Sequence, residues 1–572
     1  MIARTDPRFI AVARGDEPAD LLLRNARVIN VFTRSQSLAH VAVVGGRIAS
    51  LQGTDATEIL DLQGTTLAPG FIDAHMHVES TMLTPRGFAQ LALPCGTTSA
   101  VLDPHEIANV LGLPGIDLVL QDAIDLPLRC WFTASSCVPA SPMETAGCTL
   151  GADDLRQLLA RDEVIALAEM MNVPGVVNAD ADVLAKISAG LEASQVDGHC
   201  PGLRGRLLEA YVASGINSDH ESTTAEEAAE KLAAGMTIFI REGTAARNLE
   251  ALLPIVTPEN AHQVCFCTDD RHPSDMKRDG HIDNIIRRAI AMGLDPETAI
   301  AMGSLHTARH FSLRDHGAVA PGMRADMVEL HDLRTMEIGR VWAGGCDKHR
   351  IEKTTVDWSL ASGTMHLPND FAADSLLIPG AEGSIRVIGL LQGQLITESH
   401  TRNATICDGH RVSDPSRDIL KIAVIERHGK GGTIGLGFVE GFGIQRGAIA
   451  STVGHDAHNL AVVGCDDTSM VTAAKALSEC GGGLCVAVGD NVVCRLELPI
   501  AGLMTTVAPA TLIQNEQALY AAAQAIGSSY SNPFMPLSFL PLSVIPHLKI
   551  TDQGLIDVDA FKIVGLDILP PL

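Results

Sequence analysis

The stretch GFIDAHMHVE, residues 70–79, decides how the fold of this chain is predicted. Its first half is apolar and typical of a buried strand. Side chains alternate along a strand, so His75 and His77 are expected to project to the same side. Two imidazoles at this spacing can bind one divalent metal ion. A His-x-His motif is weak evidence alone, because histidines also occur as ordinary core or surface residues. Its interpretation therefore depends on what the later strands carry.

Short apolar runs alternate with helical segments after residue 67, a pattern that predicts βα repetition and a parallel sheet. The predicted strands are 70–78, 96–103, 130–137, 164–171, 195–200, 216–220, 236–240 and 263–270. The predicted helices between them include 153–160, 179–189, 202–214 and 225–234. Eight strands with intervening helices over roughly 250 residues predict an α/β fold with a (β/α)8 TIM-type barrel.

The segments that flank the barrel have a different pattern. Residues 20–66 contain short β-rich runs, in which Gly45-Gly46 is a hairpin signal, and short strands return after residue 318. From about residue 375, β-rich runs mix with helices, which favours an α+β domain. We therefore predict a small β-sandwich unit split over 1–66 and 318–372, a catalytic barrel over 67–317, and a C-terminal α+β domain over 373–572.

Within the C-terminal domain we predict a helix over 467–480 and a hairpin over 484–498. The proline-rich stretch SNPFMPLSFLPLSVIPHL, residues 531–548, is predicted to be an ordered loop that lies over a surface.

Composition restricts the partners of this 572-residue chain. Its net charge of −26, with a pI near 5.1, argues against nucleic acid and anionic membranes as partners. No run of 18 uncharged apolar residues is present, and the first twenty residues lack the apolar core of a signal peptide. Thirteen cysteines without a CxxC motif favour a reduced, cytoplasmic location. A hydrophobic share of 46% and a third domain favour a homo-oligomer.

Four more titratable residues lie at the ends of later predicted strands. They are Glu169, His199, His220 and Asp269. The C-terminal ends of barrel strands converge on one site, so these residues are expected to meet His75 and His77. Each alone could be a satisfied buried polar group. Together, four histidines and two carboxylates predict a site for two divalent cations.

Motifs along nearly the whole chain resemble the adenine deaminase family of the amidohydrolase superfamily. They are FIDAHMHVEST (71–81), LDPHEIANV (102–110), LAEMMNVPGV (167–176), DGHCPGLRG (197–205), IREGTAARNL (240–249), CTDDRHP (267–273), HIDNIIRRAI (281–290), APGMRADMV (320–328), GHDAHN (454–459) and LPIAGLM (498–504). A resemblance to amidohydrolases in general would not continue into the C-terminal third, so the match is specific.

The resemblance implies a metal-dependent hydrolase of cyclic amidines that converts adenine to hypoxanthine and ammonia in purine salvage. It implies two divalent ions per chain, with manganese favoured and iron or zinc as competitors. The ligands that it implies are His75, His77 and Asp269 for the more buried ion, and His199 and His220 for the second. Many superfamily members bridge the two ions with a carbamylated lysine. Residues 164–171 contain no lysine, and Glu169 stands where that bridge would be.

The expected chemistry is attack of an activated water on C6 of adenine. Asp269 would accept a proton from the water and return it to the departing amino group. Glu169 and His220 are also expected to be catalytic, and direct proton transfer is the rival to a bridging role for Glu169. The candidates for protonating the purine ring or supporting the site are Glu79, His105, Glu106, Glu221, Arg241 and Asp270. Ordinary barrel ion pairs are the favoured alternative for Arg241 and Asp270.

Two other functions stay open. One is an amidohydrolase that acts on a cyclic amide or another aminated heterocycle, and the other is a non-catalytic scaffold relative, although all six ligand positions are filled. A zinc deaminase of the cytidine-deaminase type is excluded, because Pro94-Cys95 lacks the second cysteine that the motif needs.

Two smaller signals come from a pair of cysteines and a pair of histidines. We expect Cys265 and Cys267 to be buried strand thiols and not ligands. For His455 and His458 a hydrogen-bonded turn is favoured over contact with the barrel site or an additional metal ion.

Overall fold

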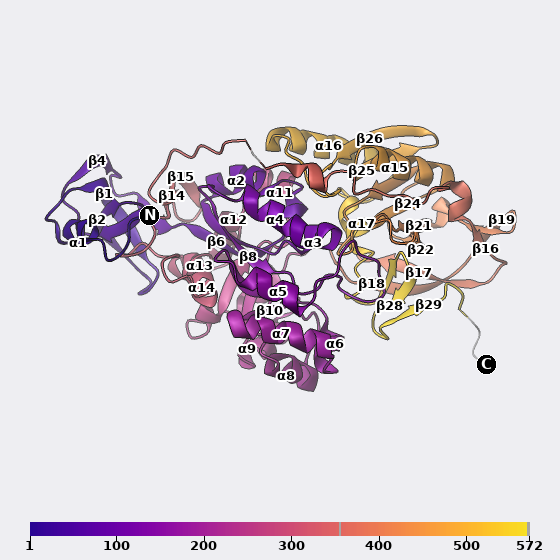
Figure 1. The fold of residues 1–572 in the computed structure, drawn as a ribbon, viewed down its shortest axis with the longest axis horizontal. Helices are drawn as coiled ribbons and strands as arrows, with labels where there is room; N and C mark the ends of the chain where they lie inside the picture. Colours follow the sequence, from indigo (N-terminus) through magenta and orange to yellow (C-terminus); the bar gives the residue numbers. More distant parts are fainter. Residues whose placement is uncertain (354–355, 569–572) are drawn as a thin grey trace.

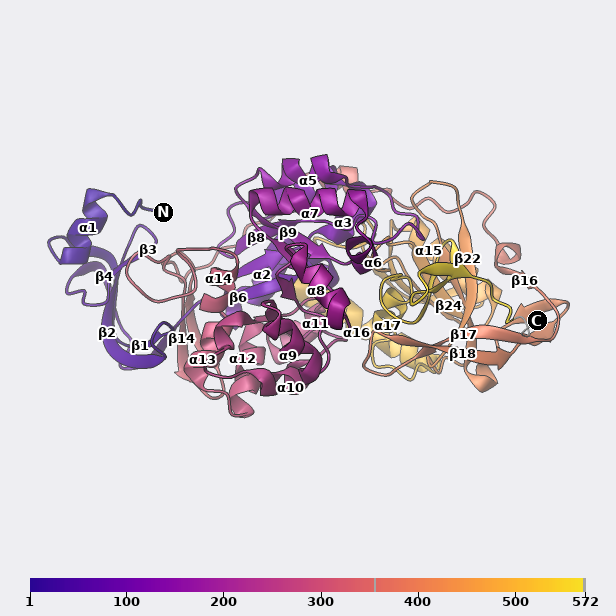
Figure 2. The ribbon, with the colours of Figure 1, turned by 90° about the horizontal axis from the view of Figure 1, so that it is seen from below.

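A computed structural model describes residues 1–353 and 356–568. Three lobes lie in a row: a small β lobe, a central barrel and a C-terminal lobe (Figure 1). The same order is seen from below (Figure 2). Among the described residues, none of the helices is both long and apolar enough to cross a bilayer.

The central lobe is the predicted barrel of eight parallel strands. They are β6 (Phe71–Met76), β7 (Thr97–Leu102), β8 (Arg129–Ala134), β9 (Val164–Met170), β10 (Val196–Gly198), β11 (Ser218–Asp219), β12 (Thr237–Arg241) and β13 (Val264–Cys267). Two parallel segments, β10-β9-β8-β7-β6 and β11-β12-β13, are joined by bridges between Val196 and Ile216 and between Met76 and Asp269. All eight predicted strands are therefore confirmed, and the last bridge brings Asp269 beside the His-x-His strand.

Helices surround this barrel (Figure 2). They include α2 (Pro85–Ala92), α3 (His105–Leu111), α4 (Leu113–Asp122), α5 (Ala152–Leu159), α6 (Val173–Val177), α7 (Ala181–Ala193), α8 (Gly205–Ala213), α9 (Ala225–Ala233), α10 (Leu249–Leu252), α11 (Pro273–Asp279), α12 (Ile282–Ala291), α13 (Pro296–Met302) and α14 (Leu305–His310). The four helices named from the sequence are present with small shifts at their ends. Side-chain caps define some starts: Asp180 accepts from the backbone of α7, and Thr224 accepts from the Glu227 N–H of α9.

The first lobe is built from both flanks of the barrel. One seven-stranded sheet has the order β15-β14-β5-β1-β2-β3, with β4 paired to β1. Its strands are β1 (Ala19–Asn30), β2 (Ser35–Val44), β3 (Arg47–Ser50), β4 (Ala56–Asp61), β5 (Thr66–Pro69), β14 (Met327–Asp332) and β15 (Glu337–Trp342), preceded by helix α1 (Pro7–Arg14). Gly45 and Gly46 form the predicted hairpin loop, with φ of +54° and +81°.

The C-terminal lobe contains an eight-stranded sheet of order β18-β17-β22-β21-β24-β23-β25-β26. Its strands are β17 (Ser384–Leu390), β18 (Thr397–Asn403), β21 (Ile419–Ile425), β22 (Ile434–Glu440), β23 (Ala448–Ser451), β24 (Leu460–Gly464), β25 (Gly483–Val488) and β26 (Asn491–Glu497). Smaller sheets join β16 (Ile378–Pro379), β19 (Thr405–Cys407) and β20 (His410–Val412), and β27 (Leu548–Thr551), β28 (Gly554–Asp557) and β29 (Lys562–Val564). The main helices are α15 (Asp467–Glu479) and α16 (Pro509–Ala525).

The proline-rich stretch differs from its prediction as a loop. It contains the short helix α17 (Phe534–Phe539), preceded by Pro533. Phe534, Leu537 and Leu540 are buried in the core of the C-terminal lobe. The domain boundaries given above remain our proposal for dividing the chain.

Candidate functional site

Glu169 lies at the centre of the predicted residues, at the end of strand β9, and is 2% exposed. Its Oε1 lies 3.6 Å from His75 Nε2 and 3.3 Å from His77 Nε2. Its Oε2 lies 2.6 Å from His199 Nδ1 and 3.2 Å from His220 Nε2. The two oxygens of one carboxylate therefore face different histidines, with His105 as a third neighbour of Oε1 at 3.6 Å.

Asp269 completes the group on the side of the first pair. It follows strand β13, and its backbone N–H donates to the carbonyl of His75 at 3.0 Å. Its Oδ1 lies 3.2 Å from His77 Nε2 and 3.7 Å from His75 Nε2. Asp269 has a φ of 56°, the left-handed region that aspartate tolerates better than most residues. The six predicted residues therefore meet at one end of the barrel.

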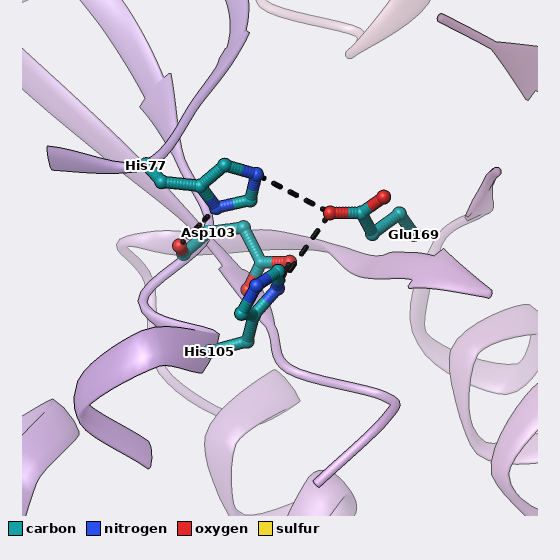
Figure 3. A group of neighbouring side chains, drawn as sticks. All are labelled: His77, Asp103, His105 and Glu169. Carbon is teal, nitrogen blue, oxygen red and sulfur yellow. Dashed lines mark hydrogen bonds and ion pairs between the residues drawn. The ribbon is translucent and has the colours of Figure 1, made fainter. Parts of the chain in front are cut away.

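The orientation of His77 is fixed by Asp103, the residue that follows strand β7 (Figure 3). Its Nδ1 lies 3.1 Å from the backbone carbonyl oxygen of Asp103, an acceptor, so Nδ1 carries the proton and Nε2 presents a lone pair. His105 lies beside this group, with Nδ1 3.0 Å from Asp103 Oδ2 and 3.6 Å from Glu169 Oε1. In Figure 3 the imidazoles of His77 and His105 are both directed at the same oxygen of the Glu169 carboxylate.

A buried ammonium group holds the second pair in place. Lys231 Nζ donates to the Cys200 carbonyl at 2.7 Å, to Asp219 Oδ2 at 2.9 Å and to Glu227 Oε1 at 2.7 Å. Asp219 Oδ1 accepts from the Cys200 N–H at 3.0 Å. Cys200 follows His199 and Asp219 precedes His220, so this network fixes the backbone next to both histidines.

Arg241 connects Asp269 to Glu221. Its Nη1 lies 2.6 Å from Asp269 Oδ2, and it forms a two-point ion pair with Glu221. Burial would raise the pKa of Asp269, but Arg241 and the neighbouring histidines hold this pKa well below its usual value. Arg241 therefore forms buried barrel ion pairs, as favoured from the sequence, and one of them is to Asp269 of the predicted site.

Unpartnered nitrogens test whether these residues fit a metal ion. Among the described residues, His75 Nε2 and His199 Nε2 are buried and make no hydrogen bond. Buried polar atoms are normally satisfied, so such atoms need a partner that the protein does not provide. Imidazole nitrogens and carboxylate oxygens are donors that divalent transition metals accept. Ligand atoms of His75, His220 and Asp269, and of Glu169, His199 and His220, are grouped closely enough to hold an ion.

The remaining candidates take different places. Asp270 lines the cavity, and burial with the nearby Asp269 charge raises its pKa. Glu79 lies in a short helix, where its Oε1 accepts from the Ile107 N–H at 3.1 Å. Burial and the charge of Glu106 raise the pKa of Glu79 to about 7, but this side chain does not line the cavity.

The C-terminal lobe covers the mouth of the barrel at this site. The cavity beside the metal-binding residues is also lined by Leu395, His455, Asp456, Phe539 and Leu542. Its volume for water-sized molecules is about 20 Å³, which holds about one water. A molecule larger than water does not fit this cavity in the described conformation.

Several functional contacts were missed by the sequence interpretation. Asp103 directly follows strand β7, so the strand-end argument used for Asp269 could have found it. Lys231 lies on helix α9 and Asp456 in another lobe, and no spacing in the sequence connects them to the barrel strands. His455 and His458, for which a turn was favoured, both contact Glu106 of the barrel.

The buried thiols agree with their prediction. Cys265 and Cys267 are fully buried in strand β13, and burial raises the pKa of both. All thirteen cysteines are free.

Two family models match the chain. The model described as "Amidohydrolase family" matches residues 66–346, and "Adenine deaminase C-terminal domain" matches residues 394–562. The first range covers the barrel and the second covers most of the lobe that closes over it.

Several relatives named "Adenine deaminase" align over almost their whole length. The one from Desulfatibacillum aliphaticivorans is 46% identical over 567 residues, covering 98% of this chain and 99% of the relative. The one from Cereibacter sphaeroides is 46% identical, covering 97% and 98%. The one from Methanothrix thermoacetophila is 44% identical, covering 98% and 99%.

Proposed function

The chain belongs to the adenine deaminase family of the amidohydrolases, and from this premise we propose that it hydrolyses adenine to hypoxanthine and ammonia. Identity of 46% over 98% of the chain, and not over the barrel alone, supports this substrate over another aminated heterocycle. One structural observation carries the proposal: a buried carboxylate whose Oε1 faces His75 and His77, with His105 beside them, and whose Oε2 faces His199 and His220. A scaffold protein would have no use for this arrangement of buried charge.

We propose that His75, His77 and Asp269 hold one divalent ion, that His199 and His220 hold a second, and that Glu169 bridges them. The division of the Glu169 oxygens between the two histidine pairs supports the bridging role over direct proton transfer. Manganese remains our preferred ion, with iron and zinc as competitors. When bound, such ions make a water nucleophilic near neutral pH.

Asp269 is the proposed proton carrier. Arg241 binds its Oδ2 and leaves Oδ1 directed toward the histidines. Asp269 accepts one proton from the attacking water and gives it to the amino nitrogen of adenine. The C6–N bond then breaks, its electron pair leaves with ammonia, and the water oxygen stays on C6 as the carbonyl of hypoxanthine.

The wider setting is also a proposal. Thirteen free cysteines support a reduced, cytoplasmic location. Release of hypoxanthine from adenine supports a role in purine salvage. A homo-oligomer remains a prediction.

Two measurements on the same preparation test this function. Metal content by mass spectrometry is combined with ammonia release from adenine, adenosine, guanine and cytosine after manganese reconstitution. We expect about two ions per chain and ammonia from adenine alone. Activity on other heterocycles but not adenine would support the alternative substrate class. Less than one ion per chain together with no activity would refute the metal-dependent mechanism.

A further inference from the structure

A loop of the C-terminal lobe forms part of the wall of the barrel site. The loop joins β23 to β24 and contains His455 and Asp456, which line the cavity together with Glu169 and Asp269. His455 is 3% exposed, and its backbone N–H donates to the Ser538 carbonyl at 2.9 Å. The loop therefore brings a buried imidazole to the metal-binding end of the barrel.

Two contacts hold the ring of His455 in one orientation. Its Nδ1 lies 2.5 Å from Glu106 Oε1, on helix α3 of the barrel. Its face stacks on the ring of Phe539, with centroids 4.4 Å apart and an interplanar angle of 15°. Within the described residues no hydrogen bond is made by Nε2. The ring is thus fixed by one nitrogen and leaves the other available on a cavity-lining residue.

His458 binds the other oxygen of Glu106. The backbone N–H of Gly454 donates to His458 Nδ1 at 3.2 Å, so Nδ1 is an acceptor and the ring proton resides on Nε2. That Nε2 contacts Glu106 Oε2. Burial lowers the pKa of His458 to about 4, in keeping with a neutral ring.

The tautomer of His458 excludes a metal site formed by Glu106, His455 and His458. Glu106, His455 and His458 are close enough to hold a metal ion. A ring nitrogen that carries a proton has no lone pair for a metal ion. The three residues are therefore linked through Glu106: a neutral His458 hydrogen-bonds one oxygen of Glu106, and the other oxygen forms an ion pair with His455.

Of the three linked residues Glu106, His455 and His458, electrostatics make His455 the cation. Burial alone would lower its pKa, but the charges of Glu106 and Asp270 raise it to about 9. Burial alone would raise the pKa of Glu106, but the positive charge of His455 holds it well below its usual value. The arrangement has the same logic as a histidine held by a carboxylate in other hydrolases, where the carboxylate fixes the ring and stabilises its positive charge.

We propose that His455 is a catalytic residue that donates its Nε2 proton to ring nitrogen N1 of adenine while water adds to C6. The proposal rests on the function proposed above. The N–H bond of the imidazolium breaks, and the electron pair of the N1=C6 bond moves to N1 and forms the new N–H bond. Hypoxanthine keeps this proton. The second proton of the water, released when the carbonyl forms, replaces the proton that His455 has lost.

Two substitutions separate this role from a structural one. His455→Asn keeps a donor near the Nδ1 position for Glu106, and His455→Gln places an amide near the Nε2 position that cannot transfer a proton. Both are expected to lower kcat by about 10²- to 10⁴-fold with KM for adenine changed much less. The control is His400→Gln, which removes another imidazole paired through Nδ1 with a glutamate, Glu440, at 2.5 Å in the same lobe. Its kcat is expected to stay near that of the wild type.

Each variant is measured for metal content, thermal midpoint, kcat and KM after manganese reconstitution. Turnover within fivefold of wild type in either His455 variant would overturn the proposal, as would loss of a metal equivalent. If both variants fail to fold, Glu106→Gln tests the same role, because it removes the carboxylate that holds His455. An undiminished kcat in Glu106→Gln would also overturn the proposal. The wild type is assayed first: failure to release ammonia from adenine refutes the proposed function and not the role of His455.

Discussion

Replacement of Lys231 by methionine is expected to destabilise the barrel and loosen its second histidine pair. Lys231 is fully buried and binds two carboxylates, of which Asp219 is also fully buried. Methionine has a similar length but cannot donate to either group. The variant therefore leaves the Asp219 charge in the protein interior without its cation.

The size of the effect follows from this burial. Removal of one partner of a buried ion pair costs about 3–5 kcal/mol, because the remaining charge is uncompensated. For a barrel of this size, each kcal/mol lowers the thermal midpoint by about 2–4 °C, so a loss of about 6–20 °C is expected. The same ammonium group fixes the Cys200 carbonyl beside His199, so the affinity for one of the two proposed metal ions is expected to fall as well.

The assay is thermal unfolding with and without manganese, together with metal content per chain. Lys186→Met is the matched control, because Lys186 pairs at the same i,i+4 spacing with Asp182, whose side chain is 65% exposed. Its midpoint is expected to move by little, because the Asp182 carboxylate left behind is exposed to solvent, and a solvated pair contributes at most about 1 kcal/mol. A Lys231→Met midpoint within 2 °C of the control, with full metal content, would refute this account of the network.

Three further predictions concern the site and its cover. Asp269→Asn is expected to retain much of the metal but to lower kcat by about 10²- to 10⁴-fold, and near-normal ammonia release would show that the proton carrier is misassigned. Glu169→Gln is expected to lose at least one metal equivalent by mass spectrometry, because an amide offers only one oxygen; full content would contradict the bridging role. Lys549 is buried and donates to the carbonyls of Leu395 and Phe539, and burial lowers its pKa to about 7. Since its unfolded pKa is about 10.4, the unfolded chain binds more protons above pH 7, and stability relative to Lys549→Met is expected to rise by about 1–3 kcal/mol from pH 7 to pH 9 in paired melts. A difference between the two proteins that stays constant with pH would contradict this burial effect.

The barrel and its strand-end residues could be predicted because they obey local rules. Each strand is a short apolar run, and parallel strands place their C-terminal ends at one edge, so Glu169 and Asp269 could be brought to His75 without knowledge of the packing. The split first lobe was also visible, because β-rich runs occur on both sides of the barrel.

The contribution of the C-terminal lobe could not be predicted in the same way. His455 and His458 lie more than 340 residues from Glu106 in the chain, and their contact depends on how two lobes dock. The local sequence around His455 and His458 is compatible both with a hydrogen-bonded turn and with a loop that lines the site. For the proline-rich stretch, the prolines suggested a loop, whereas Pro533 precedes a helix, a place where its missing N–H costs little.

The first sheet has a consequence for the order of events during synthesis. Strand β5 pairs with β14, which leaves the ribosome roughly 260 residues later. At ~5–20 residues per second, that edge of the nascent sheet waits for roughly 13–50 s. Residues of the barrel are made during this interval, so the barrel can close while the edge of β5 is still open to other chains. Several chains made at once on one messenger RNA could therefore pair through their open β5 edges, a route to aggregation that is closed once β14 has paired with β5.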